Sequence, residues 1–365
     1  IQFSNETLYR FALYLYGVNS GSGNKGTYNF GQKSLTYTAP TGFVSLQQDN
    51  MPETAKGITG LTWIKDRDAT KNHNLFDSSR GKQKELRSNS TDEEFTNADT
   101  LQKFLKGGFS IEDGTSVNNS GDSFVSWNWV GNSGSTSSNT DGSITTTTQV
   151  NSTAGFSILQ YTGNGSSGTI GHGLSSTPEW IMIKELSSAD SWNVWHTSLA
   201  NTEKLLLNDT GAKITGSTVW NSTSPTSSVI SINGNNVNAG TTTYVAYVWH
   251  GIPGFSKFGK YTGNNDTDGP FVYTGFTPAW VLIKRLNGSD DWYILDSTRE
   301  PNNPKSLYLE PNTTNAEATT GAKDFLSNGF KIRDTNFGNL AEDYIYMAFA
   351  EHPFVGDGTS PVTAR

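Results

Sequence analysis

The sequence repeats itself at a spacing that points to whole domains. Residues 277–299 read TPAWVLIKRLNGSDDWYILDSTR, and the stretch one hundred positions earlier reads TPEWIMIKELSSADSWNVWHTS, in register and without a gap. A shorter copy, LTWIKDRDATKNHNLFDSSR, occupies residues 61–80. Periods of roughly 20–50 residues indicate solenoids or propeller blades. A unit near one hundred residues is large enough for a domain, so we expect three related domains.

The residue usage favours strands over helices. Charged residues make up only 16% of the chain and aromatic residues 12%, and the sequence is visibly rich in Gly, Ser, Thr and Asn. Short strands joined by many turns suit this balance, and aromatic side chains supply the buried area that few Leu and Met would otherwise provide. We therefore predict an all-β fold of three tandem β-sandwich repeats, jelly-roll or lectin-like, with an N-terminal β segment.

Several elements can be placed along the chain. Aromatic stretches with strand composition and period recur at 123–129, 243–249 and 343–349, and each is predicted to close a repeat. Acidic starts with helical apolar spacing at 91–105 and 315–326 predict one short helix each in repeats 1 and 3.

The predicted division of the chain has five parts, of which one is a flexible linker rich in Ser, Thr and Gly. These are an N-terminal β segment (1–50), repeat 1 (51–130), the linker (131–152), repeat 2 (153–253) and repeat 3 (254–365). The YTGN tetrapeptide opens both repeat 2 and repeat 3. The N-terminal segment is too short to stand alone, so we expect it to pair with repeat 1 or to complete a preceding domain.

Charge and cysteine content exclude several functions. The net charge of −8 and the pI near 5.2 disfavour a nucleic-acid surface, because phosphate binding depends on Lys and Arg. No apolar run approaches the roughly 18 residues of a spanning helix, so no membrane insertion is expected. The chain has no cysteine, hence no disulfide and no thiolate chemistry. We predict no cofactor.

The third copy contains a charged pair that invites a catalytic interpretation. Asp296 and Arg299 stand three residues apart, as Asp77 and Arg80 do in the first copy. A carboxylate beside a guanidinium serves catalysis or ligand binding in some proteins, but an ion pair that braces a turn is the simpler explanation. The second copy has His196 in place of the aspartate, so the fold can dispense with the pair. We predict no catalytic residue and no enzymatic activity.

Two polar motifs are weaker signals. Asp266 and Asp268, in the stretch NNDTDG, offer alternating oxygen ligands and a terminal glycine, which makes them a weak calcium candidate, although turn chemistry explains the same residues. Asn-x-Ser/Thr triplets are frequent enough to arise by chance in so polar a chain. They occur at Asn89, Asn151, Asn208, Asn221 and Asn312, among others.

Surface aromatic residues are the leading ligand-binding hypothesis. An aromatic ring can stack on the apolar face of a sugar while Asn and Asp side chains bind its hydroxyl groups. Most Trp in a β-sandwich serves the core, which is the competing interpretation. The candidates chosen on this basis are Trp192, Trp195, Trp220 and Trp292.

The longest motifs also carry a family resemblance. The stretches YTGNNDTDGPFVYTGFTPAWVLIKR, DDWYILDSTRE, FLSNGFKIRD and DYIYMAFAEHPF resemble an uncharacterised repeat domain of structural proteins from marine tailed bacteriophages. Residues 26–50 look like the end of the SPRY-type domain that often precedes it. The resemblance brings no catalytic residues with it. It implies a location on the virion, in a fibre, spike or other appendage, with other virion proteins as partners.

Our hypothesis from the sequence is therefore a non-enzymatic virion protein, a tail fibre or other surface appendage, with host-surface glycans as candidate ligands. A homo-oligomer, a trimer by analogy with phage fibres, is expected. One alternative is a capsid-decorating fibre with only an architectural role. The other, from a different class, is a glycan-degrading enzyme.

Overall fold

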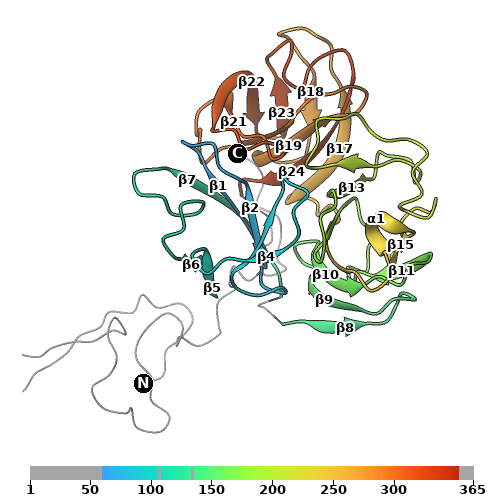
Figure 1. Ribbon diagram of the computed structural model, residues 1–365. Coiled ribbons are helices and arrows are strands. Elements are labelled where there is room, and N and C mark those ends of the chain that lie inside the picture. Colours follow the sequence, from blue (N-terminus) through green and yellow to red (C-terminus); the bar gives the residue numbers. More distant parts are fainter. Residues whose placement is uncertain (1–59, 106–107, 133–134, 353–365) are drawn as a thin grey trace, which may run out of the picture.

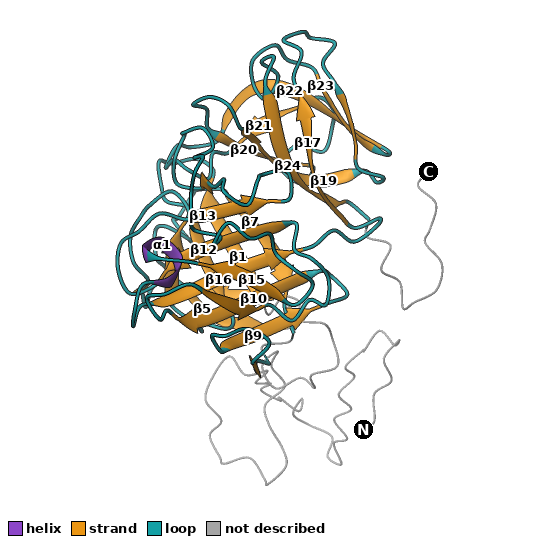
Figure 2. Ribbon diagram, turned by 90° about the vertical axis from the view of Figure 1, so that its right-hand side faces the viewer, coloured by secondary structure: helices purple, strands orange, loops and turns teal. Residues whose placement is uncertain are grey.

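A computed structural model describes residues 60–105, 108–132 and 135–352, and strands dominate these ranges (Figures 1 and 2). Every pair of neighbouring strands runs antiparallel. The one helix in the described ranges, α1 (Asn235–Asn238), is a single turn within the second repeat, between β15 and β16 in the chain. The all-β prediction is confirmed.

Repeat 1 forms a five-stranded sheet in the order β4-β3-β2-β1-β7, here called sheet 1, and a separate hairpin. The strands of sheet 1 are β1 (Gly60–Asp66), β2 (Asn74–Asp77), β3 (Lys84–Arg87), β4 (Phe95–Thr96) and β7 (Phe124–Val130). The hairpin consists of β5 (Leu101–Leu105) and β6 (Gly108–Ile111).

Sheet 2 has seven strands in the order β14-β13-β12-β16-β10-β9-β8. Its strands are β8 (Ser137–Asn139), β9 (Thr146–Asn151), β10 (Phe156–Thr162), β12 (Trp180–Glu185), β13 (Asn193–His196), β14 (Leu205–Leu206) and β16 (Thr243–Trp249). A two-stranded ribbon of β11 (Gly168–Gly171) and β15 (Val229–Ile232) accompanies it.

Sheet 3 has four strands in the order β17-β24-β19-β20, and a second four-stranded layer, β18-β23-β22-β21, packs on it. The strands of sheet 3 are β17 (Ser256–Thr262), β19 (Pro278–Arg285), β20 (Trp292–Asp296) and β24 (Asp343–Ala350). The second layer consists of β18 (Phe271–Tyr273), β21 (Lys305–Tyr308), β22 (Ala318–Leu326) and β23 (Gly329–Ile332).

The repeated stretch of the sequence is a hairpin in each sheet. Strands β19 and β20 pair antiparallel, as do β12 with β13 and β1 with β2. The aromatic strand that closes each repeat, β7, β16 or β24, pairs with the first strand of that hairpin. The local predictions for these strands are therefore confirmed.

Both faces of the first strand of the repeated hairpin (β1, β12 or β19) are buried, which explains its unbroken apolar character. In β19, Val281 and Ile283 point into the core of the sandwich formed with the second layer. Trp280 and Leu282 point to the opposite face and join a cluster that includes side chains from all three sheets. We call this cluster the central core. Figure 1 shows the three sheets grouped around a common centre.

The central core is rich in aromatic rings that touch across the sheets. Trp129 of sheet 1 packs edge-to-face on Trp249 of sheet 2, with the ring centroids 5.9 Å apart, and on Trp280 of sheet 3 at 5.5 Å. Trp180 and Trp292 meet similarly between sheets 2 and 3 at 6.1 Å. The repeats therefore share one core in addition to their own, which the sequence did not indicate.

Two predictions about local structure are wrong. Residues 91–105 contain the strands β4 and β5, and residues 315–326 contain β22, so neither range is a helix. In β22, which is paired between β21 and β23, burial alternates with a period of two, because one face of this layer packs on sheet 3 and the other does not. Residues 131–152 are not a plain flexible linker, since they contain β8 and β9. Thr146 and Thr148 are buried there while the intervening Thr147 is exposed. The predicted N-terminal segment, 1–50, lies outside the described residues.

Candidate functional site

A buried lysine occupies the same place in each hairpin. Lys65, Lys184 and Lys284 have no exposed surface, and each ammonium donates hydrogen bonds to backbone carbonyls. The Lys184 ammonium reaches the carbonyl of Thr91 in repeat 1 at 3.2 Å, and the Lys284 ammonium reaches that of Thr210 in repeat 2 at 2.7 Å. The lysine of the repeated Ile-Lys pair thus links sheet 2 to repeat 1 and sheet 3 to repeat 2.

Burial changes the acid–base behaviour of these lysines. Loss of hydration lowers the pKa of Lys65, Lys184 and Lys284 to about 8, against the attraction of nearby carboxylates, which raises it. A lysine with such a pKa is a candidate general base in an open active site. Here the ammonium groups are enclosed and bonded to carbonyls, so they act as links between segments of backbone.

Three of the Asn-x-Ser/Thr triplets are one structural motif. The side-chain oxygen of each asparagine accepts a hydrogen bond of 2.9 Å from the backbone N–H at the start of the second hairpin strand or just before it. The pairs are Asn89 with His73, Asn208 with Trp192, and Asn312 with Trp292. The amide nitrogens donate in turn to Asn72, Ser191 and Asp291. These asparagines therefore hold the same structural place in the three repeats, where each connects to the start of the second hairpin strand.

The four tryptophans proposed as stacking platforms are all buried, and that prediction is wrong. Trp192 and Trp292 have no exposed surface, and their indole N–H groups donate across repeats to the carbonyls of Arg87 and Leu206. Trp195 and Trp220 are also buried. A ring enclosed on both faces cannot stack on a ligand, whereas it contributes much apolar area to the core.

The charged pair of the first copy joins sheet 1 to sheet 2. The buried Arg80 guanidinium contacts the Asp77 carboxylate and also Glu94 at 2.9 Å. Asp77 accepts a hydrogen bond from the hydroxyl of Tyr247 at 2.7 Å, and its other oxygen caps the backbone N–H of Arg80. Burial opposes the charge on Arg80, but Asp77 raises its pKa above the ordinary value, so the group stays ionised.

The third copy makes the corresponding contact with sheet 1. Asp296 and Arg299 form a buried ion pair, and the indole N–H of Trp127 donates to Asp296 at 3.1 Å. Trp127 and Tyr247 hold equivalent places in β7 and β16, because each is two residues before the paired Trp129 or Trp249. The interpretation of the charged pairs as turn braces is confirmed. The additional finding is that each pair also binds the closing strand of another repeat.

Repeat 2 lacks the charged pair, but its hairpin still contacts the closing strand of the next repeat. His196 stands at the place of Asp296, is fully buried, and accepts a hydrogen bond from the N–H of Ser198 at 2.9 Å. Burial lowers the pKa of His196 to about 3, and the backbone of Tyr346 in sheet 3 lies close to its ring. The contacts therefore run from repeat 1 to 2, from 2 to 3 and from 3 back to 1, which closes a cycle.

An exposed aromatic pair lies on the outer layer of repeat 3. Phe271 and Tyr273, at either end of β18, are 44% and 61% exposed. They point to one face, because residues two apart on a strand share a face. Lys331 lies opposite Phe271, and Gly329 lies opposite Tyr273. A Cβ on Gly329 would collide with the carbonyl oxygen of Val272 and lie 2.9 Å from the ring of Phe271, so glycine is what lets both approach this backbone. We call these side chains the β18 surface.

Charged side chains border the β18 surface. The Lys331 ammonium contacts Asp268 at 2.8 Å, and Arg333 contacts Asp324 at 2.7 Å. Exposed rings with flanking donors and acceptors can stack on an apolar face of a ligand and bind its polar groups. Sequence reasoning missed this surface, although the alternation Phe-Val-Tyr after a turn-forming DGP was a usable signal.

The loop proposed as a calcium site leads into the β18 surface. Its backbone is held by side-chain caps, with Asp266 accepting from the N–H of Asp268 at 2.8 Å. Asn339 bonds Asn264 reciprocally, as Asn238 bonds Asn164 in repeat 2. The Asp268 carboxylate turns to Lys331, so it already has a cation beside it. Calcium binding here stays a prediction. Among the described residues no group of three or more His, Asp or Glu side chains could hold a metal ion.

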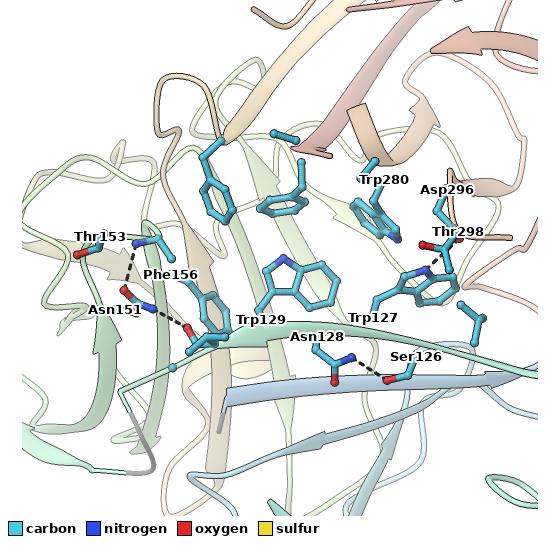
Figure 3. A pocket seen from close by; sticks show the side chains of 18 of the residues that line it. Ser126, Trp127, Asn128, Trp129, Asn151, Thr153, Phe156, Trp280, Asp296 and Thr298 are labelled. Atoms are coloured by element: carbon cyan, nitrogen blue, oxygen red, sulfur yellow. Dashed lines mark hydrogen bonds between the residues drawn. The ribbon is translucent and has the colours of Figure 1, made fainter. Parts of the chain in front are cut away.

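A cleft of about 930 Å³ lies along β7 (Figure 3). Trp127 and Trp129 point into it from β7, and Trp280 faces them from β19. The Asp296 and Arg299 pair also lines the cleft. Residues 150–154, from the end of β9 and the turn after it, contribute to the wall, and the Asn151 side chain donates to the carbonyl of Val130 at 3.0 Å.

Comparison with known proteins places the chain in a family. No helix in the described ranges has the length and apolar content needed to cross a membrane. No curated protein and no solved structure matches the chain. A family model described as a domain of unknown function, DUF7483, matches residues 45–353, most of the chain, and the protein therefore belongs to the DUF7483 family.

Proposed function

We propose that the protein is a structural component of a bacteriophage appendage, such as a tail fibre, and that it binds host-surface glycans through the β18 surface. The family resemblance of the repeat motifs supports the virion assignment. The observation that supports binding is the exposed pair Phe271 and Tyr273, which lies on a sheet whose other aromatic side chains are largely buried.

The scaffold suits this role. The cyclic contacts between the sheets, made through buried ion pairs, lysines and indole N–H groups, join the repeats into one body. A binding surface on a strand of such a body is held in place before the ligand arrives, which reduces the entropy lost on binding. Assembly as a trimer belongs to the same proposal and is checked by light scattering of the purified chain.

The binding proposal is tested on a glycan array with the full chain. Tyr273→Ser and Phe271→Ser are each expected to lower binding at least tenfold, because the stacking area is lost. Ile214→Ser is the matched control, since Ile214 is another exposed apolar side chain, 40% accessible, in repeat 2. Binding that is equal in all four proteins would assign the ligand site elsewhere, and no binding by the parent chain would favour a purely architectural role.

The virion assignment has its own experiment. Antibody against the chain is expected to label tails or fibres of purified phage particles in electron micrographs. Label confined to the capsid would favour the decorating role. Release of small saccharides from host polysaccharide by the purified chain would replace the proposal with a glycan-degrading enzyme.

A further inference from the structure

Sheet 1 lacks a strand that both other sheets possess. The closing strand β16 pairs with β12 on one side and β10 on the other, and β24 pairs with β19 and β17. Their equivalent, β7, pairs with β1 alone within the described residues. Its other edge offers a row of backbone donors and acceptors for a further strand.

The cleft along β7 is the space that this strand would occupy. In sheet 2 the strand β10 covers the closing strand, and Phe156 stacks on Trp249 with the ring centroids 4.9 Å apart. In sheet 3, Phe258 of β17 packs on Phe349 at 6.2 Å. Trp129 is the equivalent ring of sheet 1, and it faces the cleft. The volume of about 930 Å³ is enough for several side chains.

We propose that residues 42–48 of the same chain fill this cleft as a sixth strand of sheet 1. They begin Gly-Phe-Val-Ser-Leu-Gln, and the residues that lead into and form the start of β10 read Gly-Phe-Ser-Ile-Leu-Gln. The segment also precedes β1, as β10 precedes β12. The family match starts at residue 45, within the segment and ahead of sheet 1 as described.

Chain length permits this placement. Residues 49–59 connect the segment to β1, and an extended chain covers roughly 3.3–3.6 Å per residue, so this connection reaches more than about 30 Å. A strand next to the closing strand in the same sheet lies within that distance, because adjacent strands are about 5 Å apart.

The register follows from sheet 2. There Phe156 is opposite Trp249, Ser157 is opposite Val248 and Leu159 is opposite Ala246. Transferred to sheet 1, Phe43 lies opposite Trp129, Val44 opposite Asn128 and Leu46 opposite Ser126. Phe43 then covers the ring of Trp129, and the open edge of β7 gains its hydrogen bonds.

The natural chain has no cysteine, so engineered pairs report this register cleanly. Opposed residues of antiparallel strands have Cα atoms roughly 4.5–5.5 Å apart, which suits a disulfide. The double variant Val44→Cys with Asn128→Cys is expected to form an intrachain disulfide on mild oxidation. The control is Ser45→Cys with Asn128→Cys, in which the two side chains point to opposite faces and the thiols stay free.

The outcomes divide clearly. Cross-linking in the first variant and not in the control supports the proposal. Free thiols in both, equal cross-linking in both, or disulfides only between chains would overturn it, the last by assigning the cleft to a second copy.

Amide hydrogen exchange on the full chain gives a second test of the proposal. Phe43→Asp is expected to speed amide exchange in residues 124–130, whereas the control Phe30→Asp leaves it unchanged. Equal exchange in both variants would count against the proposal.

Discussion

The indole N–H of Trp127 donates a 3.1 Å hydrogen bond to the carboxylate of Asp296, although the two residues are 169 positions apart. This contact joins the closing strand of repeat 1 to the hairpin of repeat 3 and completes the cycle of contacts among the sheets. The same carboxylate holds Arg299, and the guanidinium of Arg299 lies 5.7 Å from the Trp127 ring. The pair that looked like a site in the sequence is therefore a joint between repeats.

Trp127→Phe tests how much the hydrogen bond between Trp127 and Asp296 stabilises the protein. The ring stays apolar but becomes smaller, and Asp296 loses a donor, so the lost hydrogen bond should lower the free energy of unfolding by about 1.5–3 kcal/mol beyond the effect of ring size. The control is Trp195→Phe, because the buried Trp195 N–H has no hydrogen-bond partner in the described structure. The control should lose less. Equal losses in urea titrations would show that ring size, and not the hydrogen bond, sets the cost.

Arg299→Met removes one member of a buried ion pair. Asp296 is then left buried with a charge and fewer partners, which is expected to cost about 3–5 kcal/mol of unfolding free energy. Arg333→Met is the matched substitution at a partly exposed pair with Asp324, where about 0–1 kcal/mol is expected. Denaturant midpoints for the two variants check the contrast. A loss below about 1 kcal/mol for Arg299→Met would contradict the claim that this ion pair stabilises the contact between repeats 1 and 3.

Asn208→Ala should cost more than Asn208→Asp. Alanine removes both the oxygen that accepts from the N–H of Trp192 and the amide that donates to Ser191, with an expected loss of about 2 kcal/mol. Aspartate keeps the acceptor and is expected to retain about half of this stability. Thermal unfolding of the two variants measures the difference. If both lose the same amount, the accepting oxygen is not the important atom.

Stability is expected to rise with pH between about 8 and 10. The buried lysines Lys65, Lys184, Lys284 and Lys323 have a pKa of about 8 when folded and 10.5 as the ordinary value, so the unfolded chain binds more protons in this window. Each lysine contributes a slope of up to about 1.4 kcal/mol per pH unit. Above pH 10 the trend should reverse, because burial raises the pKa of Tyr161 and Tyr261 and the unfolded tyrosines ionise first.

Lys284→Met isolates one contribution to this pH dependence. The slope of unfolding free energy against pH should shrink by up to about 1.4 kcal/mol per unit between pH 8 and 10. The substitution Lys257→Met at an exposed position of β17 serves as the control and should leave the slope as it was. Urea titrations at pH 8, 9 and 10 supply the slopes. An unchanged slope for Lys284→Met would show that this lysine is not buried in solution.

The local elements could be predicted because their signals are local. Alternation and aromatic content located the closing strands, and the repeated hairpin was recognisable from its copies. The helices predicted at 91–105 and 315–326 failed because an acidic start and apolar spacing also fit strands, here β4 and β5 in the first range and β22 in the second. The flexible linker failed for a related reason: the alternating threonines of β9 pack once a sheet is present to receive them.

The sequence by itself determined the closing strands, the three copies of the hairpin and the all-β class, since each depends on residues close together in the chain. Only the tertiary structure decided which aromatic rings are hidden and which are open. Trp192 and Tyr273 both belong to strand-like stretches, yet one is enclosed and the other is 61% exposed. The difference arises because a sheet covered on both faces buries both sets of its side chains, and no pattern within one strand records how many faces are covered.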